Sequence, residues 1–158
     1  MSSEPINVLF VCLGNICRSP MAEAVFAHVV KQKQLDGNFG TIDSAGTSSF
    51  HVGENPDSRS ASTCKDNGVP VNHRARRVTQ DDFSKFDYVL CMDNSNLADL
   101  QEMKPAGSKA TVKLFGDYDP QGETIIRDPY YGGNDGFQRN FKQVTRASEG
   151  LLKALGLI

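Results

Sequence analysis

Short apolar runs alternate with longer segments of helical periodicity along this chain of 158 residues. Residues 6–11 and 86–92 are compact runs rich in β-branched and aromatic side chains, which is typical of buried strands. Residues 41–45 and 110–115 are weaker strand candidates. Because the strands alternate with helical segments, we expect an α/β fold with a parallel sheet and right-handed crossovers.

The first helix is predicted from its capping residues. Ser19 is a suitable N-cap and Pro20 suits the first helical position, while Gly37 and Gly40 are expected to end the helix. Apolar residues recur at intervals of four from Met21, which gives this helix a broad apolar face.

Three further helical segments follow. Two short helices are predicted, one over residues 57–67, capped by Asp57 or Ser58, and one over 93–103. The last helix has one apolar face, formed by Phe137, Phe141, Val144, Leu151 and Leu155. Residues 116–136, which precede the last helix, are rich in glycine and proline, and long loops of this kind are usually functional or disordered.

Length and charge narrow the class of protein. The chain has the length of one domain, and we expect residues 1–158 to form a single domain. Its formal net charge of −2 gives no broad basic field for nucleic acid or an anionic membrane, although residues 73–77 form a local basic patch. No apolar run approaches the ~20 residues that span a bilayer. Residues 1–5 lack the features of a signal peptide, so we expect a cytoplasmic protein.

The four cysteines do not predict a disulfide framework, because a core of this size needs no covalent bridge. Cys64 and Cys91 stand alone and are expected to be buried free thiols. A zinc site would need a second close pair of ligands, and the histidines are scattered singly. We therefore expect no structural zinc site. Cys12 and Cys17 differ, because both lie in one glycine-containing segment.

That segment follows the first strand, where parallel sheets place their ligand sites. A cysteine followed after five residues by Arg18 and Ser19 lets a short loop surround a tetrahedral oxyanion with backbone N–H groups, at the positive end of a helix. Gly14 and Asn15 suit the left-handed backbone that a tight loop needs. The Arg18 guanidinium can bind two phosphoryl oxygens at once. In such a field Cys12 is expected to act as a thiolate nucleophile.

Attack on a phosphate monoester also requires a proton donor for the leaving oxygen. Asp128 is the favoured candidate, because Pro129 stiffens its segment and Tyr130 and Tyr131 beside it could line a deep slot. Two other acidic pairs compete for this role. The pair at 81–82 is interpreted as a helix cap with a solvated face, and the other competing pair is Asp117 and Asp119.

Five blocks of sequence together resemble the low-molecular-weight protein tyrosine phosphatase family. They are residues 11–23, 43–47, 73–77, 87–93 and 128–131. The resemblance runs in order from about Ile6 to the last helix. It implies a three-layer α/β fold with a four-stranded parallel sheet flanked by helices, a phosphate-binding loop after the first strand, and no metal or cofactor.

The resemblance also implies a role for each matching residue. Cys12 would be the nucleophile, Arg18 the phosphate clamp and Asp128 the general acid and then the base. The phosphate loop and its support would comprise Leu13, Gly14, Asn15, Ile16, Cys17, Ser19, Ser44, His73 and Asp93. In this set, Ser19 would hydrogen-bond the Cys12 sulfur. The substrate slot would be lined by Phe50, Tyr130 and Tyr131. Cys12 and Cys17 would form a reversible disulfide under peroxide.

Substrates would be phosphotyrosine-containing proteins or small aryl phosphates, with inorganic phosphate as product and a monomer or weakly self-associating dimer as the active form. Asn55, Asp57 and Arg59 are candidates for the polar rim of the slot, although a solvated loop is the favoured interpretation of each. Two alternatives stay open. One is arsenate reductase-like thiol chemistry, which needs a close downstream thiol pair. The other is a non-catalytic phosphotyrosine-binding or redox-sensing protein.

Overall fold

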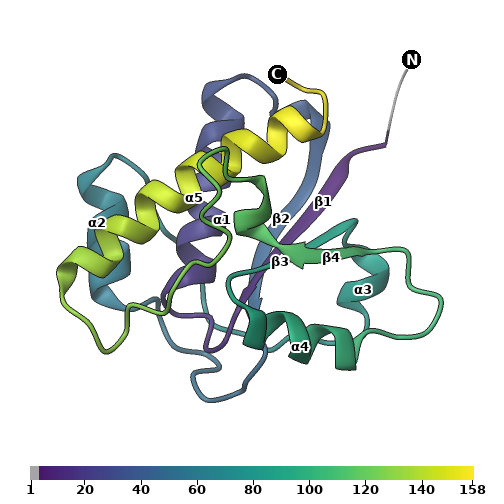
Figure 1. Cartoon of the computed structure of the whole chain (residues 1–158), viewed down its shortest axis with the longest axis horizontal. Coiled ribbons are helices and arrows are strands. Elements are labelled where there is room, and N and C mark those ends of the chain that lie inside the picture. Colours follow the sequence, from purple (N-terminus) through teal and green to yellow (C-terminus); the bar gives the residue numbers. More distant parts are fainter. Residues whose placement is uncertain (1–3) are drawn as a thin grey trace.

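A four-stranded parallel sheet lies at the centre of the computed structural model, which describes residues 4–158 (Figure 1). Residues 1–3 of the expected leader lie outside the described residues. The strands are β1 (Ile6–Cys12), β2 (Phe39–Gly46), β3 (Tyr88–Cys91) and β4 (Thr111–Leu114), in the spatial order β2-β1-β3-β4. All four predicted strands are therefore present. The central position of β1 explains its apolar sequence, because Val8 to Val11 are completely buried.

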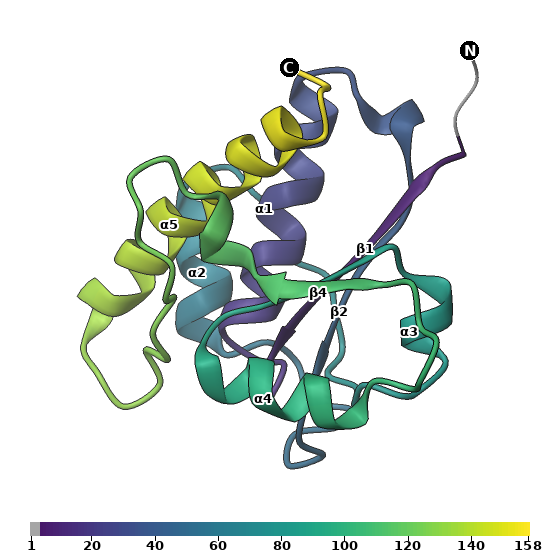
Figure 2. The same cartoon turned by 45° about the vertical axis from the view of Figure 1, so that its right-hand side comes forward.

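Five helices cover the two faces of this sheet. They are α1 (Arg18–Gln32), α2 (Ser58–Asp66), α3 (Asp82–Lys85), α4 (Asn94–Met103) and α5 (Asn134–Ala154). Single 3₁₀ turns, η1 and η2, occupy Asp36–Asn38 and Phe115–Tyr118. Side chains of β1 alternate between the faces, and Val8 and Phe10 pack with α1, α2 and α5. Leu9 and Val11 pack with α3 and α4. The predicted three layers are confirmed, and Figure 2 shows them from a second direction.

The start and end of α1 differ from the prediction. The helix begins at Arg18 after Cys17, so Ser19 is its second residue and not its N-cap. The Ser19 hydroxyl instead lies beside the Cys12 sulfur. At the other end the helix stops at Gln32, before Gly37, and Gln34 adopts a left-handed backbone with φ of 59°. The predicted N-cap was wrong because a tertiary contact occupies the hydroxyl.

The other helices agree better with the pattern. Asp57 is the N-cap of α2, where its side chain accepts a hydrogen bond from the Arg59 N–H. Asp93 caps α4 in a reciprocal capping box with Asn96. On α5, Phe137, Val144 and Leu151 are fully or almost fully buried, as the amphipathic pattern predicts. Within residues 4–158, no helix has both the length and the apolar character needed to cross a membrane.

Candidate active site

The carboxyl end of β1 continues directly into the loop that surrounds the Cys12 sulfur. Cys12 is 2% exposed. The backbone N–H of Asn15 donates a hydrogen bond to its Sγ at 3.3 Å, and the Ser19 hydroxyl lies 3.1 Å from the same atom. Both contacts can stabilise negative charge on the sulfur. The loop then enters α1, whose first backbone N–H groups add the positive end of the helix dipole.

Asn15 supplies the sharp bend of this loop. Its φ of 60° lies in the left-handed region, and its side chain is almost fully buried. The Asn15 amide donates to Ser19 Oγ at 2.8 Å and to Ser44 Oγ at 3.0 Å. Its oxygen accepts from the backbone N–H of Arg76 at 3.0 Å and lies 2.8 Å from His73 Nε2. Every hydrogen-bonding atom of this amide is therefore used to hold the bend.

Gly14 is needed for a different reason from the one predicted. Among the described residues the left-handed position of this loop is Asn15, and Gly14 is not one of the glycines with positive φ. A Cβ on Gly14 would instead lie 2.9 Å from Cδ2 of His51. A side chain at this position would therefore have to displace the His51 ring.

Behind the bend lies a half-buried cluster of charged and polar groups. Ser44 Oγ donates to Glu23 at 2.7 Å, and His73 Nδ1 lies 3.2 Å from the same carboxylate. Burial raises the pKa of Glu23 to about 7, although the Ser44 hydrogen bond acts in the opposite direction. Burial also lowers the pKa of His73, against the attraction of Asp43. Burial thus disfavours the charged form of both the carboxyl and the imidazole.

The same cluster includes the one group of possible metal ligands found among the described residues. Ligand atoms of Glu23, Asp43 and His73 lie within 4.8 Å of one another. However, the Arg76 guanidinium already neutralises Asp43 at 3.1 Å. A cation here would compete with this ion pair. The residues of the cluster are therefore better suited to supporting the loop than to binding a metal.

Arg18 is directed from the first turn of α1 to the mouth of the loop. Its guanidinium is 3% exposed and donates to Asp93 at 2.6 Å and to the Ile126 carbonyl at 3.0 Å. These two acceptors fix the plane of the fork, as expected for a bidentate anion clamp. Asp93 also caps α4, so one carboxylate connects the clamp to the far side of the sheet.

Asp128 faces this clamp from the long loop before α5. Its carboxylate lies 3.6 Å from Arg18 Nη2 and is 40% exposed. The Tyr130 N–H donates to Asp128 Oδ1 at 3.0 Å, which forms a tight turn. The Arg59 guanidinium holds this turn against α2, because it donates to the Tyr130 carbonyl at 3.1 Å and lies over the Tyr130 and Phe137 rings.

A slot of about 320 Å³ opens over the loop. Its walls include Cys12, Arg18, Asp128 and a mostly apolar set comprising Leu13, Ile16, Phe50, His51, Tyr130 and Tyr131. The Tyr130 and Tyr131 rings meet edge to face at 4.9 Å. Phe50 and Tyr131 are 77% and 94% exposed, so they form the rim and not the base. Such a slot is suited to an aromatic group carrying a terminal anion.

The other three cysteines are held as neutral thiols. Burial, followed by the charge of Asp57, strongly raises the pKa of Cys17. Burial raises the pKa of Cys64 and of Cys91 to about 12 in each case. Cys64 and Cys91 are fully buried free thiols, as predicted.

Two of the competing acidic residues, Asp82 and Asp119, lie in ion pairs, and none of the four lines the slot. Asp82 is 6% exposed, and its two oxygens accept from the Arg76 guanidinium at 3.0 and 3.1 Å. The predicted solvated face at residues 81–82 was therefore wrong for Asp82. Asp119 is also buried, and the hydrogen bonds of Arg146 lower its pKa.

The structure gathers the predicted residues at one edge of the sheet and adds residues that the sequence reasoning missed. Arg59 was interpreted as part of a solvated loop, yet it fastens the Asp128 turn. Glu23, Arg76 and His51 were not singled out for the site. Arg76 lies in the basic block 73–77. A partly buried basic residue needs an acidic partner, and this requirement is the only sequence signal that could have identified Arg76 as part of the site. No pattern around Glu23 or His51 indicates their positions.

Known proteins share this arrangement along nearly the whole chain. A family model described as low molecular weight phosphotyrosine protein phosphatase matches residues 7–157. The low molecular weight phosphotyrosine protein phosphatase of Saccharomyces cerevisiae is 50% identical over 151 residues, which cover 94% of each protein.

Two solved structures are also similar. A protein tyrosine phosphatase from Entamoeba histolytica has a TM-score of 0.91 at 40% identity and covers 96% of this chain and 97% of its own. A Drosophila arginine phosphatase has a TM-score of 0.89 at 37% identity, with 95% and 98% covered. Identity at this level over almost the full length of both proteins places the chain in the low molecular weight phosphotyrosine protein phosphatase family.

Proposed function

We propose that this chain hydrolyses phosphotyrosine and small aryl phosphates through a cysteinyl-phosphate intermediate. The observation that carries the proposal is the convergence of three groups on one slot. Cys12 Sγ lies at its base, Arg18 is held beside it by Asp93, and Asp128 lies 3.6 Å from Arg18. Nucleophile, anion clamp and proton donor are the groups that transfer of a phosphoryl group requires.

The reaction proceeds in two displacements. The Cys12 thiolate attacks phosphorus, the bond from phosphorus to the aryl oxygen breaks, and Asp128 gives its proton to that oxygen. Water then attacks the phosphocysteine, Asp128 takes a proton from it, and the sulfur leaves as inorganic phosphate forms. The Ser19 hydroxyl, 3.1 Å from Sγ, stabilises the departing thiolate. Arg18 and the loop N–H groups bind the phosphoryl oxygens throughout.

The walls of the slot support an aromatic substrate. Ile16 and Leu13 present apolar surface beside the loop, and Phe50, Tyr130 and Tyr131 extend it outward. Binding of a guanidinium group, as in phosphoarginine, requires acidic side chains. Among residues 4–158, Asp128 is the only acidic side chain that lines this slot. We therefore assign phosphotyrosine as substrate, and phosphoarginine is the comparison substrate because one structural relative is named an arginine phosphatase.

The test is hydrolysis of a phosphotyrosyl peptide near pH 5.5 in EDTA. Wild type is expected to release phosphate, Cys12→Ser to lose turnover while still binding phosphate, and Cys64→Ser to serve as the matched thiol control with activity retained. Asp128→Asn should lower kcat by about 10²–10⁴ on a substrate with a poor leaving group. Equal rates for wild type and Cys12→Ser would disprove the nucleophile, and faster hydrolysis of a matched phosphoarginine peptide would disprove the substrate.

The alternatives predict other outcomes in the same assay. A binding or sensing protein would give no turnover. An arsenate reductase would produce arsenite with a thiol reductant, but the later cysteines are buried in α2 and β3. We further infer that Cys17, which lines the slot, protects Cys12 by a reversible disulfide. The cytoplasmic location and the monomer or weak dimer stay predictions.

A further inference from the structure

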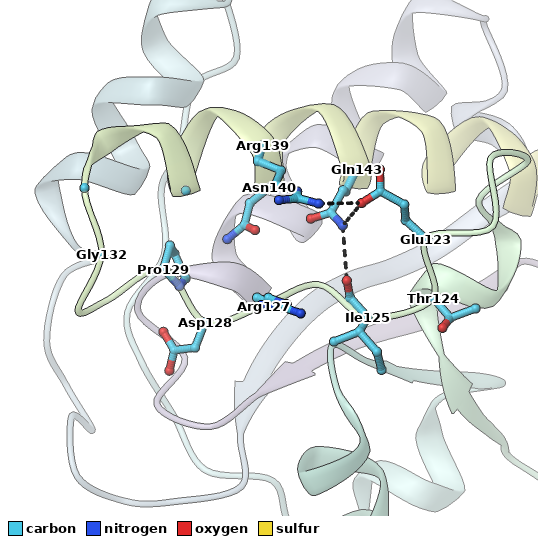
Figure 3. Close-up of a pocket in the computed structure, with 12 residues that line it drawn as sticks. Glu123, Thr124, Ile125, Arg127, Asp128, Pro129, Gly132, Arg139, Asn140 and Gln143 are labelled. Carbon is cyan, nitrogen blue, oxygen red and sulfur yellow. Dashed lines mark hydrogen bonds and ion pairs between the residues drawn. The ribbon is translucent and has the colours of Figure 1, made fainter.

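A second cavity of about 460 Å³ lies behind the Asp128 segment, on the opposite side from the slot. Figure 3 shows it between α5 and the chain from Glu123 to Pro129. Asp128 lines both spaces, so a single stretch of backbone separates them. At the outer end the wall consists of Gly132, Gly133 and Gly136, which present no side chains. The shared Asp128 places the cavity next to the slot.

Two buried amides on the α5 wall have unmet hydrogen-bonding capacity. Asn140 and Gln143 are each 3% exposed, and both line the cavity. Among the described residues, Asn140 Nδ2 has no acceptor and Gln143 Oε1 has no donor. The orientation of the second amide is fixed, because Gln143 Nε2 donates to Glu123 at 3.0 Å and to the Ile125 carbonyl at 3.1 Å. Unpaired buried polar atoms are costly, so a ligand that offers both an acceptor and a donor is favoured here.

The charges around the cavity favour an anion. Arg127 and Arg139 line it, and Arg139 is 69% exposed, with a long contact of 3.5 Å to Glu123. The N-terminus of α5 opens on the same space without a side-chain cap. Two acidic residues also line the cavity, and both already contact arginines. Glu123 also contacts Arg146 at 3.2 Å, and Asp128 faces Arg18. An incoming carboxylate would therefore meet two arginines.

We propose that this cavity is a subsite for an acidic residue in the peptide that flanks the phosphotyrosine of a substrate. The inference rests on the proposed function and adds a substrate preference to it. A peptide supplies what the wall lacks, since each peptide unit carries a carbonyl for Asn140 Nδ2 and an N–H for Gln143 Oε1. Its Glu or Asp side chain supplies the anion for Arg127 and Arg139. The glycine rim leaves open space at Gly133, where a Cβ would meet nothing within 4 Å.

The experiment uses phosphotyrosyl peptides in which one Glu is moved through the positions on either side of the phosphotyrosine, with Gln as the matched residue. Wild type, Arg139→Gln and Lys142→Gln are compared at low ionic strength. Lys142 is exposed on the same helix but does not line this cavity. We expect Glu to raise kcat/KM over Gln by roughly two- to fivefold at one or two adjacent positions. Arg139→Gln should abolish this ratio and Lys142→Gln should keep it.

Three outcomes would overturn the subsite. The first is a kcat/KM for the Glu peptide that equals that for the Gln peptide at every position. The second is the same preference for Glu at all positions. The third is an equal loss of the preference in both variants, which indicates general charge attraction. A small aryl phosphate separates this failure from failure of the proposed function, because all three proteins should hydrolyse it at the same rate. As a second readout, binding of the Glu peptide to Cys12→Ser should shift the Asn140 and Gln143 side-chain amide NMR signals, and unchanged signals would contradict the contact.

Discussion

Asn15 is the residue at which local backbone conformation and a buried hydrogen-bond network are combined. Replacing it by alanine removes four hydrogen bonds, to Ser19, Ser44, His73 and the Arg76 N–H. It also leaves a Cβ-bearing residue without a compensating side chain at φ of 60°. We expect both the stability of the fold and the affinity for phosphate to fall, because the Asn15 N–H is one of the groups that face the Cys12 sulfur.

The size of the effect follows from these terms. Four net hydrogen bonds at about 0.5–1.5 kcal/mol each give roughly 2–6 kcal/mol. Left-handed backbone costs alanine about 1–2 kcal/mol. Asn15→Gly loses the same hydrogen bonds but not the backbone term, while its freer unfolded chain costs about 0.4–1 kcal/mol. Asn15→Gly should therefore equal or exceed Asn15→Ala in stability, by up to ~1.5 kcal/mol.

Urea denaturation of the three proteins measures the free energies of unfolding, and competitive inhibition by phosphate measures the state of the loop. Both variants should bind phosphate more weakly than wild type. A loss of less than about 1 kcal/mol in Asn15→Ala would refute the hydrogen-bond reasoning. A glycine variant clearly less stable than the alanine variant would refute the backbone reasoning.

Two further predictions concern residues around the site. Arg59→Met should lower kcat/KM by about three- to tenfold on aryl phosphates with poor leaving groups, because the Asp128 turn loses its hydrogen bond at the Tyr130 carbonyl. The effect should fade for good leaving groups, and a uniform loss along a leaving-group series would argue against a positioning role. Burial raises the pKa of Glu23 to about 7. Protonated Glu23 therefore makes its full contribution to the free energy of unfolding below about pH 4.5, and this contribution is lost as the pH rises through 7. Relative to Glu23→Gln, wild type should lose up to ~3 kcal/mol of unfolding free energy over that range. The lowered pKa of His73 acts in the opposite sense, but it does so in both proteins. Parallel curves of unfolding free energy against pH for the two proteins would contradict the assignment.

Most elements of the fold could be predicted from local sequence patterns. The apolar runs predicted the two central strands, β1 and β3, because a buried parallel strand needs continuous apolar sequence, whereas β2 and β4 gave weaker patterns. Asp57 and Asp93 were identifiable as residues at helix starts, since a cap acts within three residues of itself. The spacing between Cys12 and Arg18 likewise lies within one loop, so its chemistry could be read without knowledge of the rest.

Residues joined by the fold could not be predicted in that way. Arg76 pairs with Asp43, which is distant in sequence, and with Asp82, which is only six residues away. No periodic pattern indicates either ion pair, so the two residues at 81–82 looked solvated although Asp82 is buried. Ser19 resembled a helix cap in the local pattern, and its contact with the Cys12 sulfur at 3.1 Å was implied only by the family resemblance. The partnership of Asn15 with Ser44 and His73 came from the family resemblance, not from any local pattern.

The central position of β1 has a consequence for how the chain folds as it is synthesised. β1 leaves the ribosome before both of its neighbours in the sheet, because β2 and β3 lie about 30 and 80 residues later. Until β3 emerges, one edge of β1 is an unpaired apolar template of the kind that promotes aggregation. The Asp128 turn and α5 are made last, so a nascent chain can complete the cradle around Cys12 before it acquires the proton donor.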